Sequence, residues 1–352
     1  MNKLKIGIVG LGSIAKQVHL PALSTFADAE IVAAAEKDAH TGEVVGRKWK
    51  IPKIYSSFSE MYEDCSLDAV FICLPNFLHV PAIQEALNHG MHVFCEKPMG
   101  LSSADAQALV LSAKNNNCIL AVGYNQRMNK NYREAREIVA SRRLGNVLQV
   151  HGVYQNAGPY ASWIPSSDWF FNDKFGVLYD SGPHLIDLFR FILSDTIVEL
   201  SASGISTMGS FDIYDNISGN FITGNNALGT FSLGWKEAVN FNSIEVHGTG
   251  GSVIVNSQGV QEQYSSYSDY ERLVHYGDSI RDIIRIQLNQ VSGRTRPTDT
   301  YVEEDRAFID TIKGHTTSIV SGEEGLRVLE ILEAIKTSIE QKKTTRVTCH
   351  TV

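Results

Sequence analysis

The stretch KIGIVGLGSIA, residues 5–15, joins an apolar strand to the start of a helix through a glycine-rich turn. Its spacing, Gly10-x-Gly12-x-x-Ala15, is the one found where a strand passes into a helix that binds a dinucleotide. Gly10 permits the tight turn, Gly12 the close approach of a pyrophosphate, and Ala15 the packing of the helix on the strand. Backbone N–H groups at a helix start favour an anion, and the predicted contacts here are Gly10, Gly12, Ser13 and Ile14.

An acidic residue follows this turn at the distance that a dinucleotide site requires. The predicted strand 30–36 ends at Glu36, about 20 residues beyond the turn, where a carboxylate hydrogen-bonds the adenosine ribose hydroxyls. Because the same carboxylate repels a 2′-phosphate, the sequence predicts NAD in preference to NADP. The adjacent Lys37 can accommodate that phosphate, so NADP stays open. The alternative is a structural glycine turn followed by an unrelated surface glutamate.

Strands and helices alternate through the first 125 residues. Continuous apolar strands that alternate with helices are typical of a parallel sheet covered on both faces. We therefore expect a doubly wound α/β domain that binds a dinucleotide over residues 1–125. The predicted strands span 5–10, 30–36, 68–74, 92–96 and 118–124, and the predicted helices span 13–27, 79–89 and 102–116.

The pattern changes near residue 145, where strand-like runs follow one another with turn residues between them. Such a series favours a large, mostly antiparallel open sheet, with the helix predicted at 182–193 on one face. Residues 126–352 are therefore predicted as a second α/β domain. The stretch 256–298 lacks a clear period and is interpreted as a surface insertion or a subunit-contact arm. The other predicted strands span 146–155, 196–206, 216–224, 227–235, 242–250, 253–255 and 345–348, and the other helices 302–313 and 323–341.

The composition of the 352-residue chain narrows its class. A net charge of −8, without a dense basic run, argues against a nucleic-acid partner. No segment reaches the roughly 18 consecutive apolar residues of a membrane span, and the N-terminus lacks a signal-peptide pattern. The five cysteines form no CxxC pair, which is typical of a reducing compartment. We expect a cytoplasmic protein with neither a nucleic-acid nor a membrane partner.

A lysine follows the predicted strand 92–96 in the motif Glu96-Lys97-Pro98. Ligands of an open parallel sheet bind beyond the carboxyl ends of its strands, so Lys97 shares an edge with the glycine turn. Pro98 fixes its own φ and restricts Lys97 to extended conformations, which holds the lysine in place. The motif therefore predicts a functional lysine. The alternative is an ordinary surface lysine after a strand.

Three ionisable groups interrupt the apolar run YDSGPHLIDLFRFIL, residues 179–193. Asp180, His184 and Asp187 are costly to bury without partners. Their spacings of four and three residues place them on one face of a helix. That face is expected to close a cleft opposite Lys97. A metal site is the less favoured alternative, because no further Cys or His cluster supports it, and no metal is predicted.

Four motifs stand in one order along the chain: GIVGLGSIA (7–15), LPNFLHVPAIQEALNHGMHVFCEKPM (74–99), VGYNQR (122–127) and GVLYDSGPHLIDL (176–188). In this order and spacing they resemble the glucose–fructose oxidoreductase/inositol dehydrogenase/MocA (Gfo/Idh/MocA) family, as does the C-terminal run 318–347. The resemblance implies a Rossmann domain, followed by an α/β domain whose open sheet often forms a subunit interface. It also implies reversible hydride transfer between NAD(P) and a secondary alcohol of a sugar or cyclitol.

The resemblance assigns chemical roles to individual residues. Lys97 matches the family's active-site lysine, and Asp180 and His184 match the acid and the histidine of its DxGxHxxD motif. Oxidation of an alcohol needs a base for the proton, and histidine titrates near neutrality. We therefore predict His184 as the general base, Lys97 as the group that polarises the reacting oxygen, and Asp180 as the group that positions a substrate hydroxyl. Asp187 is predicted to orient His184 or to cap structure.

The same resemblance predicts contacts around the cofactor and the substrate. Pro75, Asn76 and His79 match a loop that wraps the cofactor, and Arg127 lies where the family often places a substrate-contacting group. One departure is that only Gly176 precedes the catalytic aspartate, where many relatives have two or three glycines. The predicted cofactor contacts are Gly10, Gly12, Ser13, Ile14, Glu36, Lys37, Pro75, Asn76, His79, Glu96 and Lys97.

Aromatic residues precede the catalytic motif in GPYASWIPSSDWFF. Aromatic faces suit the apolar C–H faces of a sugar ring, so Trp163 and Trp169, with Tyr160 beside them, are predicted to line the substrate cleft. A surface loop anchored by core aromatics is the alternative.

Three functions are compatible with these motifs. The leading hypothesis is an NAD(P)-dependent dehydrogenase of a sugar or cyclitol hydroxyl. The alternatives are an NAD-dependent glycosidase and a non-catalytic sensor that keeps the cofactor site, although a sensor need not keep Lys97, Asp180 and His184 together. The strand-rich second half has few helices to cover both faces of its sheet, so we expect a homodimer or homotetramer.

Overall fold

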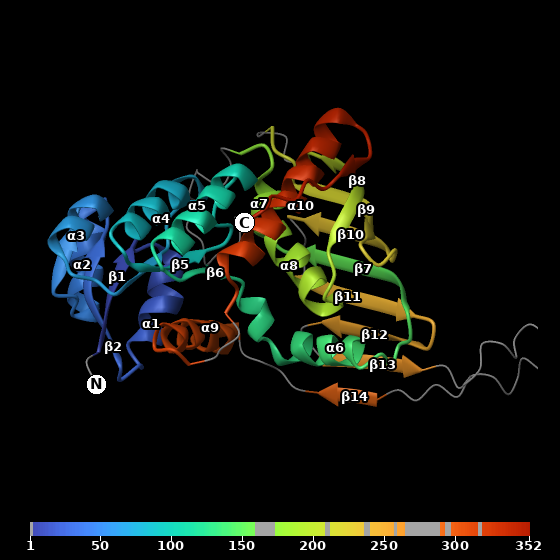
Figure 1. Ribbon diagram of the computed structural model, residues 1–352, viewed down its shortest axis with the longest axis horizontal. Coiled ribbons are helices and arrows are strands. Elements are labelled where there is room, and N and C mark those ends of the chain that lie inside the picture. The colour runs from blue at the N-terminus through green and yellow to red at the C-terminus, as the bar shows by residue number, and fades with distance from the viewer. Residues whose placement is uncertain are drawn as a thin grey trace, which may run out of the picture.

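The structure is a computed structural model in which two sheets, each with its own helices, lie beside each other (Figure 1). The first sheet is built from the N-terminal third of the chain and the second mostly from the remainder. The structure describes residues 3–158, 173–207, 212–235, 240–256, 259–264, 289–292, 297–315 and 319–352.

The first sheet has six strands in the order β3-β2-β1-β4-β5-β6. All five neighbouring pairs run parallel, which confirms the predicted doubly wound sheet. The strand order reverses between β1 and β4, and ligands of such sheets bind beyond the carboxyl ends of the strands at this point. The strands are β1 (Leu4–Val9), β2 (Ala29–Ala35), β3 (Lys53–Tyr55), β4 (Ala69–Ile72), β5 (His92–Glu96) and β6 (Leu120–Gly123).

Helices cover both faces of this sheet. One hydrophobic cluster contains α3 (Phe58–Asp64), α4 (His79–Asn88) and α5 (Ser103–Asn115), and a second one contains α1 (Leu20–Leu23) and α2 (Ala39–Trp49). The helix predicted over 13–27 is shorter than expected, since a π-helical turn, η1 (Ala15–His19), leads into α1. Pro21 has no N–H to donate to the preceding turn, which interrupts a regular α-helix there. The elements β3, α2 and α3 were not among the predicted ones.

The second sheet has nine strands in the order β14-β13-β12-β11-β7-β10-β9-β8-β15. Its described neighbours pair antiparallel except β10 and β7, which confirms the predicted mostly antiparallel sheet. Two of its strands, β13 and β14, lie in the stretch 256–298 that showed no clear period. The strands are β7 (Val147–Gln155), β8 (Ile197–Ile205), β9 (Asn216–Thr223), β10 (Leu228–Gly234), β11 (Phe241–Gly248), β12 (Gly251–Asn256), β13 (Gly259–Tyr264), β14 (Asn289–Ser292) and β15 (Thr345–Arg346).

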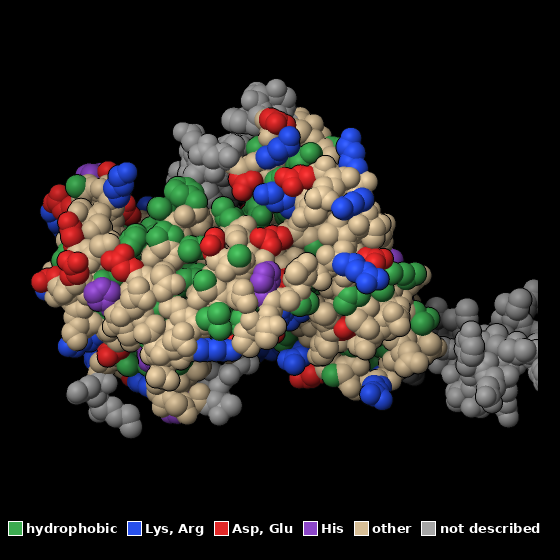
Figure 2. All heavy atoms as spheres, turned by 45° about the horizontal axis from the view of Figure 1, so that its top comes forward, with side chains coloured by type: hydrophobic (Ala, Val, Ile, Leu, Met, Phe, Trp, Pro, Cys, Tyr) green, Lys and Arg blue, Asp and Glu red, His purple; other side chains and the backbone are tan. Residues whose placement is uncertain are grey.

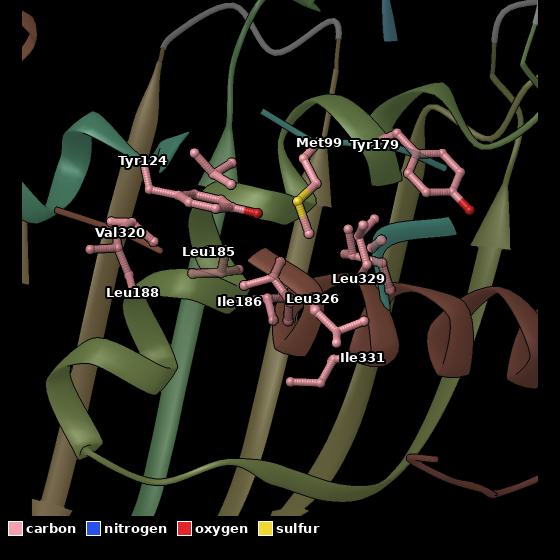
Figure 3. Close-up of a cluster of buried hydrophobic side chains, with 14 of the residues drawn as sticks. Met99, Tyr124, Tyr179, Leu185, Ile186, Leu188, Val320, Leu326, Leu329 and Ile331 are labelled. Atoms are coloured by element: carbon pink, nitrogen blue, oxygen red, sulfur yellow. The ribbon is translucent and has the colours of Figure 1, made fainter. Parts of the chain in front are cut away.

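Three helices pack on one face of the second sheet: α6 (Lys130–Ala140), α8 (Gly182–Leu193) and α10 (Gly322–Gln341) (Figure 1). A Cβ atom on Gly152 of β7 would lie 2.3 Å from Cζ of Phe189, so the missing side chain lets α8 approach the sheet closely. Figure 3 shows Met99, which follows β5, among the apolar side chains of α8 and α10. The loop after β5 is therefore anchored in the core that carries α8.

The helix α9 (Pro297–Ile312) returns to the first sheet. Phe308 packs against Phe71 of β4 and Phe94 of β5, with ring centroids 5.4 and 5.7 Å apart. Figure 1 shows α9 beneath the first sheet, next to α1. A segment late in the sequence thus completes the core of the first sheet. The predicted domain boundary at residue 125 stays a prediction.

The surface carries charges of both signs. On the face shown in Figure 2, Lys and Arg side chains are scattered among acidic ones. In the part of the chain that the structure describes, no helix combines the length and the apolar character needed to cross a membrane.

An ion-pair network anchors α8 to the turn that follows β6. Arg127 lies in the 3-10 turn η3 (Asn125–Met128) after β6, and its Nε and Nη2 donate to the Asp187 carboxylate on α8 at 2.6–3.0 Å. Nη2 of Arg127 also contacts Glu324 of α10 at 2.8 Å. Arg190 of α8 donates to the same glutamate. Because Asp187 is fully buried, the guanidinium of Arg127 supplies the countercharge that this helix needs.

Replacing Arg127 should destabilise the fold strongly. The variant Arg127→Met leaves Asp187 buried without its cation, so we expect the free energy of unfolding in urea to fall by about 3–5 kcal/mol. The control Arg346→Met removes an ion pair with Glu199 in which the arginine side chain is 88% exposed. That variant should lose less than about 1 kcal/mol. Equal losses for the two variants would contradict the anchoring role of Arg127.

Candidate active site

Lys97 and Asp180, predicted from separate motifs, meet in the structure. Lys97 follows β5 at the carboxyl edge of the first sheet, and its peptide bond to Pro98 is cis. Its Nζ donates to the backbone oxygen of Asp180 at 2.8 Å and contacts the carboxylate Oδ1 at 3.2 Å. The two side chains are only 15% and 23% exposed. One direct charge-assisted contact therefore joins the two motifs across the domains.

The remaining oxygen of Asp180 is held from the second sheet. The indole Nε1 of Trp235, at the end of β10, donates to Oδ2 at 3.1 Å, and the Ser181 hydroxyl lies 3.3 Å from the same atom. Trp235 is buried, and a buried indole N–H needs an acceptor. Sequence analysis missed Trp235; its place at the end of an apolar strand was the only signal available. These contacts fix the Asp180 carboxylate in one orientation.

His184 lies in the first turn of α8, close to Asp180. The helix α7 (Gly176–Asp180) is separated from α8 only by Ser181, whose backbone is also helical, so the chain from Asp180 to His184 has the helical backbone that the predicted shared face requires. The imidazole stacks on Tyr154 of β7, with centroids 5.5 Å apart and planes inclined by 16°. Among the described residues, Nδ1 of His184 has no hydrogen-bond partner. Burial, and secondarily the charge of Lys97, lower the pKa of His184 well below its ordinary value, so the ring is neutral near pH 7.

Asp187 does not orient His184. Its two carboxylate oxygens accept hydrogen bonds from Arg127, and burial raises its pKa against the opposing effect of that guanidinium. The same contacts give Arg127 an anchoring role, and its predicted contact with a substrate stays a prediction. Among the described residues, no group of three or more His, Cys, Asp or Glu side chains is arranged to hold a metal ion.

The glycine turn after β1 has the shape that a dinucleotide requires. Gly10 has a φ of +87°, and a Cβ atom there would lie 2.6 Å from the carbonyl oxygen of Cys73. Gly12 has no heavy atom within 4 Å of the place that a Cβ would take, so its backbone is open to a ligand. Ser13 and Ile14 follow as the first helical residues. The exposed backbone at this helix start fits a pyrophosphate.

Glu36 stands beside the same turn, directly after β2. Its Oε2 accepts a hydrogen bond from the backbone N–H of Leu11 at 2.8 Å, and its Oε1 accepts one from Asp38 at 3.0 Å. The carboxylate is therefore held next to the glycine turn, as a ribose contact requires. Lys37 is exposed at the neighbouring position.

The loop after β4 is tied to the loop of Lys97 by His79. This ring is fully buried; its Nδ1 lies 2.7 Å from the carbonyl oxygen of Pro98 and its Nε2 lies 2.8 Å from that of Leu74. Both ring nitrogens of His79 are therefore engaged within the protein. The side chain links two loops, and this does not fit a direct contact with the cofactor. Pro75 and Asn76, which precede it, are half-buried at the carboxyl end of β4.

Glu96 was predicted as a cofactor contact, but its carboxylate is engaged within the protein. Oε1 lies 3.0 Å from Nε2 of His19, and Oε2 accepts a hydrogen bond from the backbone N–H of Lys97 at 3.2 Å. His19, on η1, was not singled out in the sequence, because its partners come from distant segments. Trp163 and Trp169, together with Tyr160, lie outside the described residues.

Family models match both halves of the chain. The model described as "Oxidoreductase family, NAD-binding Rossmann fold" matches residues 4–124, and the model "GFO/IDH/MocA C-terminal domain" matches residues 132–254. Curated relatives include myo-inositol 2-dehydrogenase from Thermotoga maritima, which is 27% identical over 98% of both chains. Inositol 2-dehydrogenase from Rhizobium meliloti is 26% identical over 97% of this chain and 98% of that protein.

Solved structures share the whole architecture. Levoglucosan dehydrogenase in complex with NADH and L-sorbose has a TM-score of 0.84 at 21% identity, covering 99% of this chain and 100% of the other. The apo scyllo-inositol dehydrogenase from Lactobacillus casei has a TM-score of 0.78 at 21% identity, with 98% of both chains covered. At this identity the structural likeness shows the fold, and the family models carry the assignment. With both of its halves matched and its nucleotide turn formed, the chain belongs to the Gfo/Idh/MocA family of NAD-binding oxidoreductases.

Proposed function

We propose that this protein transfers a hydride reversibly between NAD and a secondary hydroxyl or ketone of a cyclitol or sugar. The observation that carries the proposal is the contact of Lys97 with Asp180, with a neutral, buried His184 in the next helical turn. This brings a cation, a carboxylate and a proton acceptor together at the sheet edge that also carries the nucleotide turn.

The three side chains have complementary roles in alcohol oxidation. The Lys97 ammonium hydrogen-bonds the reacting oxygen and stabilises the negative charge that develops on it. His184 takes the hydroxyl proton, for which its lowered pKa keeps the imidazole unprotonated near pH 7. Asp180, fixed by Trp235, orients the lysine and accepts a hydrogen bond from a substrate hydroxyl. When bound, the nicotinamide accepts the hydride, and in the reverse direction it supplies one.

The substrate class is proposed from the relatives. Two full-length relatives are named inositol 2-dehydrogenases, and a third, 24% identical over 91% of both chains, is named 1,5-anhydro-D-fructose reductase. All three names describe a ring bearing several hydroxyls or a ketone. A carboxylate and an ammonium in a partly buried site suit recognition of such neighbouring hydroxyls.

The direct test is a screen of purified protein with cyclitols, aldoses, polyols and nucleotide sugars, followed by NADH fluorescence. The proposal expects stoichiometric NADH from at least one cyclic polyol. Glycoside hydrolysis without net NADH would identify the transient-oxidation glycosidase instead. Tight NAD binding without turnover of any compound would favour the sensor.

Removing His184 should separate chemistry from cofactor binding. We expect His184→Ala to lower kcat by roughly 10²–10⁴-fold, the usual worth of a positioned acid–base group. NAD affinity should stay unchanged, because the glycine turn and Glu36 lie in the other domain. In the native enzyme, kcat/KM for oxidation should fall only at a pH below about 6.5, since the pKa of His184 lies under that ordinary value. The variant should lose this acid limb.

The control for this variant is His89→Ala, an exposed histidine that follows α4 and precedes β5 of the first sheet, and this variant should retain native turnover. Lys97→Ala should also reduce turnover strongly, and Asp180→Asn should weaken substrate binding or turnover. These losses should not add, because the groups act on one transition state. Near-native turnover in a folded His184→Ala protein would assign the proton to another group.

We also propose that NAD is preferred over NADP. Glu36, held beside the glycine turn, repels a 2′-phosphate. We expect NAD to bind more tightly than NADP when each cofactor is titrated. Glu36→Ala should reduce or reverse this difference in affinity, because Lys37 then pairs with the 2′-phosphate. Glu137→Ala, which removes an exposed carboxylate on α6, is the control. A native preference for NADP of tenfold, about 1.4 kcal/mol, would contradict the role of Glu36.

The open face of the second sheet is proposed as the surface of a homodimer or homotetramer. The strand register places Ile205, Leu228 and Phe241 on the face opposite α8. These side chains are 61%, 56% and 52% exposed in the single chain. Exposed apolar side chains that share one sheet face are typical of an interaction surface.

Light scattering at micromolar concentration tests the assembly. The native protein should be larger than a monomer, and Leu228→Lys should shift it toward monomer because a charge would be buried in the interface. Val44→Lys, at an equally exposed apolar position on α2, should leave the assembly unchanged. A native monomer would rule out this interface.

A further inference from the structure

His19 joins three segments of the chain that lie far apart in sequence. The ring is completely buried at the end of η1. Its Nδ1 lies 2.9 and 3.1 Å from the two carboxylate oxygens of Asp305 on α9, and its Nε2 lies 3.0 Å from Oε1 of Glu96 at the end of β5. A single imidazole therefore connects the nucleotide-turn helix, the strand that leads to Lys97, and α9.

The contacts of His19 require a cation. A carboxylate accepts hydrogen bonds, and a neutral imidazole has only one N–H to donate, so two ionised partners call for both ring nitrogens to be protonated. Burial alone lowers the pKa of His19, but the charges and hydrogen bonds of Asp305 and Glu96 outweigh it and raise the pKa to about 10. The rings of Phe71 and Phe94 surround His19, with centroids 5.6 and 5.4 Å from that of the imidazole. They exclude water from the contacts of His19 with the two carboxylates.

Other acidic groups face the same cluster from α9. Both carboxylate oxygens of Glu304 are buried without a hydrogen-bond partner among the described residues, and burial, with the charges of Glu96 and Asp305, raises the pKa of Glu304 well above its ordinary value. Tyr301 is half-buried, and its ring centroid lies 6.1 Å from that of His19. Burial also raises the pKa of Asp305, against the opposing charge and hydrogen bond of His19, so the cationic ring is the partner that favours ionised Asp305 and Glu96.

The charge of Lys97 acts on two carboxylates, those of Glu96 and Asp180. Glu96 is its neighbour in sequence, and Asp180 lies across the domain boundary. His19 and the backbone N–H of Lys97 occupy one oxygen each of Glu96. Glu96 is thus satisfied without the ammonium, and the hydrogen bonds and charge of His19 keep its pKa low despite burial, which alone would raise it. The lysine side chain is left free to reach Asp180.

We infer that His19 is a positioning residue for the active-site lysine: it neutralises Glu96, so that the Lys97 ammonium points to Asp180 and to the substrate oxygen. The inference rests on the proposed role of Lys97. Without the imidazolium, Glu96 would recruit Lys97 as its counterion, because a buried carboxylate without a partner is costly.

The protonation of His19 is measurable without substrate or cofactor. In protein labelled with ¹⁵N at histidine, both ring nitrogens of His19 should carry protons at pH 8, where an ordinary histidine is neutral. The signal is assigned by its loss in His19→Gln. A neutral ring at pH 8 would overturn the inference.

The effect on Lys97 is also visible in the apo protein. Reductive ¹³C-methylation keeps the lysine charge and places a probe on Nζ, and Lys97→Arg identifies its signal. The signal should move in His19→Gln. The control is His92→Gln. His92 lies at the start of β5, the strand that leads to Lys97, and accepts a hydrogen bond from the Ile119 N–H. This variant should leave the Lys97 signal in place. An unmoved signal in His19→Gln would overturn the inference.

A double-mutant cycle tests the path through Lys97. We expect His19→Gln to lower kcat by about tenfold or more, because a tenfold loss corresponds to one misplaced hydrogen bond of about 1.4 kcal/mol. NAD affinity should stay within about threefold of native. In the Lys97→Ala background the same change should cost no further activity. If the losses of kcat in the two single variants multiply in the double variant, the role of His19 is merely structural. The same conclusion follows if His19→Gln lowers kcat and NAD affinity in parallel.

A second variant keeps the test decisive where His19→Gln fails to fold. Asp305→Asn preserves shape and removes one of the two charges that hold the imidazolium, so it should move the Lys97 signal in the same direction by a smaller amount. If no compound is turned over, the proposed function fails while the two spectroscopic measurements still decide the role of His19.

Discussion

The contact between the Lys97 ammonium and Asp180 is the constraint on which the site depends. Lys97 belongs to the edge of a parallel sheet and Asp180 to a helix carried by a second sheet, so their meeting fixes one domain against the other. The same loop places Met99 in the apolar core of α8 and α10 (Figure 3). Apolar packing thus brings the two halves together, and one charged contact sets the register of the reacting groups.

The motifs predicted the fold well, because it depends on local pattern, while the catalytic roles of Lys97, Asp180 and His184 stay predictions. The alternation of strands and helices gave the six-stranded parallel sheet, and the helix over 182–193 was placed with its observed bounds. The short strand β3 and the strands β13 and β14 were missed, since their pairing is decided by neighbours across a sheet and not by an apolar run. Likewise, nothing local in the sequence reveals that α9 completes the first core.

The partners of polar side chains were predicted less well than the side chains themselves. Helical spacing placed Asp187 beside His184, yet its charge is balanced by Arg127, which comes from the distant turn after β6. Spacing on one helix shows which residues share a face, whereas a buried charge binds the nearest available countercharge. Trp235 and His19 escaped notice for the same reason, because each acquires its role from a contact between distant segments.

Two buried histidines in this molecule show how far such contacts decide chemistry. His19 lies between the carboxylates of Glu96 and Asp305 and is held as a cation, whereas His184 lies beside the Lys97 ammonium and is held neutral. Burial favours the neutral form of both, so the sign of the neighbouring charge decides the difference. A cationic His184 would repel Lys97 and could not accept a proton, and a neutral His19 would leave Glu96 to compete for that lysine. The opposite protonation states of two chemically identical rings are therefore parts of one arrangement, in which the Lys97 ammonium is directed at Asp180.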